Sequence, residues 1–251
     1  MGAVIAVANR KGGVGKTTVT EHLAVGMAAR GLRVVVVDCD PQGNLTSLLL
    51  GGVEDDGLYR MLVAKTMPAL ETLLRVVETG GRPFGLVSGD VTTGDAIAML
   101  AIGQRLGEIT ARIKALGQRV DVVLLDMPPS QAVGFRQLLD GADWLLVVSV
   151  MERLAVEGVG QMVAIAVERG TRLMGIVPNM VRQTVEHREN MAALMERLGE
   201  RADLVWAPIP HTVRVAEAQA YGETMFAYEP DNPATVALRG TVERVAGVLE
   251  V

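Results

Sequence analysis

Cysteine, lysine and aromatic residues are scarce in this chain of 251 residues, which has one cysteine, four lysines and 3% aromatics. The single cysteine, Cys39, excludes a disulfide framework and favours a reducing cytoplasm. Because 49% of the residues are apolar, we expect a core of Val, Leu, Ile, Ala and Met. No apolar run approaches the length of a membrane span. The net charge of −5 argues against nucleic-acid binding through overall charge, but leaves room for a local arginine patch.

The lysines are unevenly placed along the chain. Lys11 and Lys16 lie five residues apart, although only four of the 24 basic residues are lysines. A compact ammonium group on a flexible stem suits a phosphate in a tight loop better than a planar guanidinium does. The pair therefore points to phosphate binding. The three histidines are scattered, and none has a carboxylate or cysteine at metal-ligand spacing.

A glycine-rich loop surrounds this lysine pair. It is a shifted form of the phosphate-loop pattern and contains Lys11, Gly12, Gly13, Val14, Gly15, Lys16, Thr17 and Thr18. An apolar run over residues 4–8 precedes it, and a helical pattern over 17–30 follows it. In that context backbone N–H groups and the helix N-terminus can bind phosphate oxygens. Lys16 would lie against the β- and γ-phosphates and the Thr17 hydroxyl would ligate Mg²⁺, whereas Lys11 has no role in an ordinary loop of this type.

Carboxylates follow two other apolar runs. Asp38 and Asp40 follow residues 34–37, and Asp126 follows residues 122–125. Asp40 could orient the attacking water, Asp38 could join the second shell of Mg²⁺, and Asp126 could hold the ion through water. The alternatives are that Asp38 and Asp40 cap the next helix, and that Asp126 simply ends a buried strand.

Short apolar runs alternate with helical patterns along the whole chain. This order predicts an α/β fold with a doubly wound, mostly parallel sheet and helices on both faces, of the P-loop NTPase kind. No linker or repeat divides it, so we expect residues 1–251 to form one ATPase domain without a preceding helix-turn-helix. The expected strands are 4–8, 34–37, 120–125, 145–150 and 173–177, with a weaker candidate at 84–87.

Four ordered motifs resemble those of the ParA/MinD family of deviant Walker A P-loop ATPases, above all its ParA/Soj partition ATPases. Residues 8–18 are similar to the family's N-Q-K-G-G-V-G-K-T-T, and residues 38–44 to D-x-D-P-Q-G-N. Residues 126–130 are similar to D-x-P-P-S, and residues 209–218 to I-P-R-N-V-R-L-S-E-A. The matches span nearly the whole chain. Three positions depart from the pattern: Ser149 and Gln219 stand where proline is usual, and His211 replaces an arginine.

The resemblance implies a role for each matching residue. Lys11 would reach across an ATP-sandwiched homodimer to the partner's phosphate, while Lys16, Thr17 and Thr18 would serve the nucleotide of their own subunit. Asp40 would orient the water. Asn179 would contact the adenine, helped by the loop that contains Pro210, although an ordinary strand-to-helix turn is the alternative for Asn179.

The resemblance also implies partners and a location. The ATP-bound dimer would bind non-specific DNA through arginines such as Arg214 and Arg188, and a ParB-like protein would stimulate slow hydrolysis and release. Either arginine could equally be a solvated surface charge. We expect a cytoplasmic, nucleoid-associated ATPase for plasmid or chromosome segregation, with ATP and Mg²⁺ as cofactors.

Other functions remain as alternatives. A MinD-like, membrane-recruited regulator needs a basic amphipathic tail, and residues 241–251 hold one arginine against two glutamates, so we expect no stable membrane binding. A ParA-like positioner of a protein cargo would share all of the motifs. A reductase of the nitrogenase iron-protein kind needs two cluster cysteines per subunit, and this chain has one cysteine. A metabolic ligase or kinase would have no use for Lys11.

Overall fold

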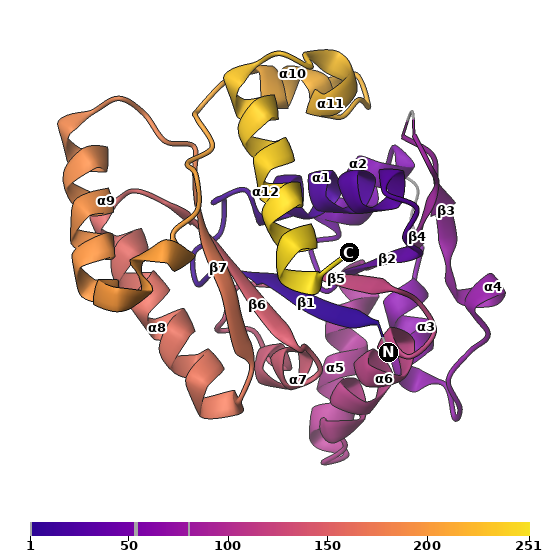
Figure 1. The fold of residues 1–251 in the computed structure, drawn as a ribbon. Coiled ribbons are helices and arrows are strands. Elements are labelled where there is room, and N and C mark those ends of the chain that lie inside the picture. Colours follow the sequence, from indigo (N-terminus) through magenta and orange to yellow (C-terminus); the bar gives the residue numbers. More distant parts are fainter. Residues whose placement is uncertain (1, 53–54, 80) are drawn as a thin grey trace.

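A seven-stranded sheet with strand order β3-β4-β2-β5-β1-β6-β7 forms the centre of the computed structural model, which describes residues 2–52, 55–79 and 81–251 (Figure 1). Its strands are β1 (Ala3–Ala8), β2 (Val34–Asp38), β3 (Arg75–Val77), β4 (Phe84–Val87), β5 (Val122–Asp126), β6 (Trp144–Val150) and β7 (Arg172–Asn179). Neighbouring strands pair in parallel except at one edge, where β3 runs antiparallel to β4.

Helices cover both faces of this sheet (Figure 1). One face is covered by α1 (Lys16–Ala29), α2 (Asn44–Leu50), α10 (Arg214–Ala220), α11 (Met225–Tyr228) and α12 (Pro233–Leu249). The other is covered by α3 (Gly57–Val63), α5 (Val91–Ile102), α6 (Gly107–Gly117), α7 (Phe135–Asp140), α8 (Arg153–Arg169) and α9 (Val185–Leu198). The short helices α4 (Leu70–Leu73) and η1 (Gly199–Leu204) complete the set in the described residues. The prediction of a doubly wound, mostly parallel α/β fold is confirmed.

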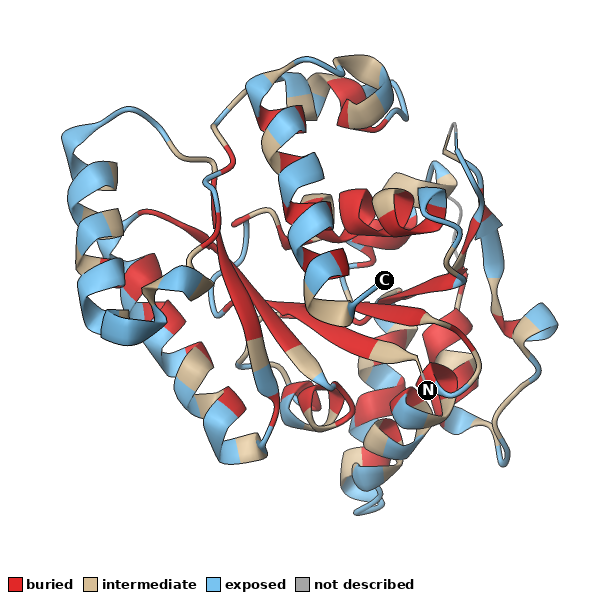
Figure 2. Ribbon diagram, in the orientation of Figure 1, coloured by how far each residue is buried: buried red, intermediate tan, exposed pale blue. Residues whose placement is uncertain are grey.

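The strands are buried on both faces because consecutive side chains point to opposite sides. In β1, Ile5 and Val7 pack beneath α1 and α12, whereas Val4, Ala6 and Ala8 pack in the opposite layer. Figure 2 shows the resulting distribution, with buried strands in the middle and exposed residues on the outer sides of the helices. The core has the aliphatic character that the composition predicts.

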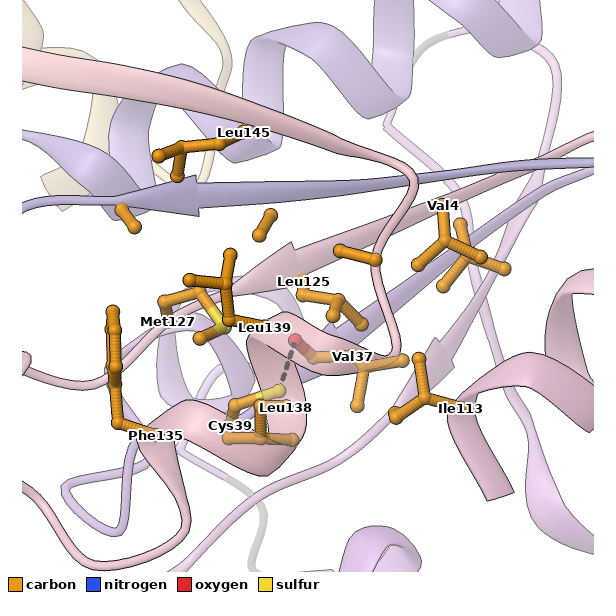
Figure 3. Close-up of a cluster of buried hydrophobic side chains, with 14 of the residues drawn as sticks. Val4, Val37, Cys39, Ile113, Leu125, Met127, Phe135, Leu138, Leu139 and Leu145 are labelled. Atoms are coloured by element: carbon orange, nitrogen blue, oxygen red, sulfur yellow. Dashed lines mark hydrogen bonds between the residues drawn. The ribbon is translucent and has the colours of Figure 1, made fainter. Parts of the chain in front are cut away.

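Figure 3 shows part of the layer beneath β1, β2 and β5, where Cys39 packs near Met127 and Leu138. The Cys39 side chain is fully buried, and its Sγ lies 3.6 Å from the Val37 carbonyl oxygen. Burial raises the pKa of this thiol well above its ordinary value, and the neighbouring carboxylates add to the shift. Cys39 is therefore a small core residue.

The carboxyl ends of the parallel strands bring the predicted site residues to one edge of the sheet. Asp38 at the end of β2 is in register with Asp126 at the end of β5. The phosphate loop follows β1, which lies next to β5, and Asn179 ends β7. In open α/β sheets ligands bind at this edge, where the crossover connections leave on opposite faces.

Candidate nucleotide-binding site

The backbone of the phosphate loop requires glycine at two positions. Gly13 and Gly15 have φ values of 72° and 88°, in the left-handed region that side chains with a Cβ rarely adopt. A Cβ at Gly15 would also overlap the side-chain amide of Asn179. Asn179 Nδ2 instead donates to the Val14 carbonyl oxygen at 2.8 Å, so the end of β7 fixes the loop. Contacts within the chain therefore help to hold the loop in shape, and Asn179 has a structural contact besides its expected one with the base.

Lys16 and Thr17 begin α1, directly after Gly15. Lys16 is only 8% exposed, and Thr17 Oγ1 donates to Asp126 Oδ2 at 2.8 Å. Burial, followed by the like charge of Asp38, raises the pKa of Asp126 to about 7. A buried carboxylate next to a hydroxyl would be stabilised by a cation, and the Thr17 oxygen can ligate an ion while its hydrogen remains bonded to Asp126.

Mg²⁺ fits this arrangement in the manner of P-loop ATPases. Among the described residues, no three His, Cys, Asp or Glu side chains gather into a metal cluster. Thr17, Asp126 through water, and phosphate oxygens would therefore supply the ligands. Once bound, the ion would neutralise charge on the β- and γ-phosphates.

Asp38 and Asp40 have different surroundings although they are two residues apart. Asp38 is fully buried, and its Oδ2 accepts hydrogen bonds from the Thr46 N–H at 2.8 Å and the Thr46 hydroxyl at 2.9 Å. Its Oδ1 accepts from the Asp40 N–H at 3.2 Å. Burial raises the pKa of Asp38 to about 6. Asp38 thus fixes the turn after β2, and this turn places Asp40 at the wall of a cavity shared with Lys16.

Two adjoining cavities lie at this edge of the sheet. The larger, about 930 Å³, is lined by the phosphate loop, the turn after β2 and residues 219–222. The smaller, about 330 Å³, is lined mainly by apolar residues and also contains Asn179 and Pro210. Thr18, Met180 and Gln219 line both. A polar cavity beside an apolar one suits a nucleotide, with phosphates in the first and base in the second.

Lys11 lines neither of these two cavities. Its Nζ lies 2.7 Å from Glu152 Oε2 at the start of α8, and both side chains are half exposed, at 51% and 50%. The hydrogen bond from Lys11 holds the pKa of Glu152 below its ordinary value. Sequence reasoning did not single out Glu152, which is 141 residues away and belongs to none of the four motifs.

The two arginines expected at DNA differ in their surroundings. Arg188 is exposed on α9. Arg214 begins α10, where its Nη1 lies 2.6 Å from Glu217 Oε2 and its Nε lies 3.4 Å from Glu229 Oε2. Two carboxylates therefore offset the charge of Arg214.

Comparisons with known proteins identify the family and agree with the fold. Residues 2–171 match the family described as an AAA domain. The chain is 36% identical over 249 residues to the chromosome-partitioning ATPase Soj of Thermus thermophilus, covering 96% of this chain and 94% of that protein. It is 32% identical over 241 residues to the chromosome partitioning protein ParA of Caulobacter vibrioides, covering 90% and 87%. The structure of the septum site-determining protein MinD from Pyrococcus horikoshii, complexed with Mg-ADP, superposes with a TM-score of 0.80 at 22% identity and 99% coverage of both chains.

The fold and the site define a P-loop ATPase that uses ATP and Mg²⁺. The chain belongs to the AAA-domain family, among its ParA/Soj-type members.

Proposed function

We propose that this ATPase drives DNA partition by forming an ATP-sandwiched homodimer. The dimer binds non-specific DNA on the nucleoid, and a ParB-like partner releases it by stimulating hydrolysis. The names of the Soj and ParA relatives support the partition role. All seven strands of the described residues belong to a single sheet, which supports its action as one domain.

The position of Lys11 carries the proposal. An exposed ion pair contributes about 0–1 kcal/mol, so Lys11 can exchange Glu152 for a more highly charged group at little cost. A phosphate of a partner's nucleotide is such a group. The γ-phosphate of ATP adds the negative charge that makes this exchange favourable with ATP and less so with ADP.

Hydrolysis then follows from residues of both subunits. Lys16, Thr17 and Asp126 hold the nucleotide and Mg²⁺ within one chain, and Asp40 orients water at the cavity wall. Lys11 of the partner offsets charge that develops in the transition state, as an arginine finger does. In the free chain that lysine is bound to Glu152, so basal hydrolysis should be slow.

DNA binding would use exposed arginines rather than overall charge. Arg188 can contact phosphate directly, whereas Arg214 would exchange Glu217 for a DNA phosphate. Such contacts release counterions, so binding should weaken steeply with salt. A positioner of a protein cargo would share the ATP site, and the DNA assay below discriminates between the two.

A MinD-like membrane anchor has less support. In the described residues no helix combines the length and apolar character needed to cross a bilayer, a requirement that a peripheral anchor does not have. The apolar residues of α12, including Leu238, Val242 and Val245, are buried against the sheet and α1. Inserting them into lipid would expose that part of the core.

Sedimentation velocity with Mg²⁺ and either ATP or ADP tests the proposal. We expect a dimer with ATP and a monomer with ADP, and we expect Lys11→Ala to remain monomeric with ATP. Lys114→Ala is the matched control because Lys114 is exposed in the last turn of α6, and it should dimerise as the wild type does.

The same samples titrated with non-specific DNA test the second half of the proposal. ATP-dependent binding that is lost between low and moderate salt supports DNA partition. A dimer without DNA binding favours a protein cargo, and ATP-dependent pelleting with liposomes favours the membrane regulator. Equal ATP-dependent dimerisation of Lys11→Ala and wild type would refute the role of Lys11.

A further inference from the structure

Thr18 lies where the two cavities meet, and its carbonyl oxygen and its hydroxyl are each bonded to a residue outside the phosphate loop. Its carbonyl oxygen accepts a hydrogen bond from His22 Nδ1 at 2.7 Å. Its hydroxyl oxygen accepts one from Gln219 Nε2 at 3.2 Å. Since Gln219 lies in α10, 201 residues away, the second bond joins α10 to the first turn of α1.

His22 is fixed in one tautomer by its two partners. Its Nε2 accepts a hydrogen bond from the Met225 N–H at 3.0 Å, so Nδ1 must carry the hydrogen that is donated to Thr18. The Phe226 ring packs edge-on against His22, with ring centroids 5.0 Å apart. Thus α11 fixes His22, which in turn fixes the backbone of Thr18.

Glu21 is a second buried polar group on this side of α1. It is 4% exposed, and its Oε2 has no hydrogen-bond partner among the described residues. Burial raises the pKa of Glu21 to about 8, and a hydrogen bond from the Gln219 side chain opposes the shift. The Gln219 amide therefore contacts both Glu21 and Thr18, which restricts its orientation.

The bond from Gln219 determines where the Thr18 hydroxyl can donate. A hydroxyl has one hydrogen and two lone pairs. Because Gln219 donates to the oxygen, the Thr18 hydrogen must point away from Gln219, and Thr18 lines both cavities. A hydroxyl that already accepts a hydrogen bond is also a stronger donor. A proline at position 219, usual in the related sequences, could not supply this bond.

We propose that Gln219 is a nucleotide-positioning residue, which orients the Thr18 hydroxyl toward a phosphate of bound ADP or ATP at the boundary of the base and phosphate cavities. This inference rests on the nucleotide site but not on dimerisation, because every group involved belongs to one chain. It applies equally to ADP and ATP, since both carry the phosphates nearest the sugar.

Binding of Mg-ADP by calorimetry tests it in the variants Gln219→Met and Thr18→Val and in the double variant. Methionine keeps the length of the side chain and removes the donor. We expect Gln219→Met to raise the Kd for ADP and for ATP alike by roughly three- to tenfold, the effect of one hydrogen bond. In the Thr18→Val background the same substitution should have no further effect, because the hydroxyl on which it acts is absent.

Two further readouts separate positioning from general loosening of the fold. Gln219→Met should raise KM for ATP with kcat unchanged, since this phosphate does not react. Its melting temperature without nucleotide should stay near that of the wild type. Gln118→Met, in an exposed position at the end of α6, is the control and should change none of these values.

An unchanged Kd for Gln219→Met would overturn the proposal, as would an equal loss in the Thr18→Val background. A wild-type chain that binds ADP as expected but never dimerises would refute the proposed function and leave the role of Gln219 intact.

Discussion

The two ends of the phosphate loop differ in how the chain surrounds them. At the C-terminal end of the loop, Lys16 is 8% exposed and Thr17 is bonded to Asp126, so the chain itself completes that half of the site. At the N-terminal end of the loop, the Lys11 side chain is 51% exposed, and Glu152, with which it forms an ion pair, is a half-exposed surface residue. In the proposed function, burial fixes Lys16, which would bind the nucleotide of its own chain in every state. Exposure leaves Lys11 free to move, as it must if it acts on the partner's nucleotide only when ATP is bound.

The largest effect that this comparison predicts is at Lys16. Within the phosphate loop, Lys16 is the charged residue that lines the larger cavity. Lys16→Ala removes that charge, so Mg-ADP binding should fall below detection by calorimetry. Lys11→Ala should bind Mg-ADP with a Kd within a few-fold of the wild type, since Lys11 lines neither cavity. If both substitutions weakened ADP binding equally, the two ends of the loop would not be distinct in function.

A smaller effect concerns Glu21, which lies in α1 behind the buried end of the loop. Its pKa in the folded chain is about 8, above its ordinary value of 4.5, so the folded state holds the proton more tightly. The contribution of Glu21 to stability is therefore fully present below about pH 4.5, and it is lost as pH rises toward 8.

Glu21→Gln removes this dependence because glutamine does not ionise. Urea unfolding without nucleotide measures the free energy of unfolding of Glu21→Gln minus that of the wild type. This difference should increase by on the order of 2 kcal/mol between pH 6 and pH 8. His22, whose burial lowers its pKa to about 4, is common to both proteins and cancels in the difference. A constant difference across this range would show that Glu21 is ionised in the fold.

Most of the fold could be predicted because its strands are buried on both faces. Such strands are continuous apolar runs, and all six predicted ones are present, with ends shifted by up to two residues. The strand that was missed, β3, has three residues, of which Arg75 and Val76 are exposed. It forms through pairing with β4 at the sheet edge, and its own sequence has too few residues for a periodic pattern.

The site could be predicted in part for a similar reason. Local motifs identify Lys16, Thr17, Asp40 and Asp126, because each lies at the end of a strand, in the turn just after it, or in the first turn of a helix whose pattern is visible. Partners that come from distant elements leave no such signal. Glu152 and the bond of Gln219 to Thr18 depend on how α8 and α10 pack, and Gln219 was noticeable in the sequence only as a departure from the family pattern.

Mixing two inactive variants tests most directly whether Lys11 acts on the partner's nucleotide. Lys11→Ala and Asp40→Ala should each have little ATPase activity alone, because one lacks the lysine and the other lacks the group that orients water. In a mixed dimer, the Lys11→Ala subunit keeps its own Asp40 and receives Lys11 from its partner. We predict that an equimolar mixture regains ATPase activity that neither variant has alone, because each mixed dimer has one complete site. The rate would reach roughly a quarter of the wild-type rate if the mixed dimers formed as often as random pairing gives. A mixture as inactive as its components, under conditions in which mixed dimers form, would contradict the account.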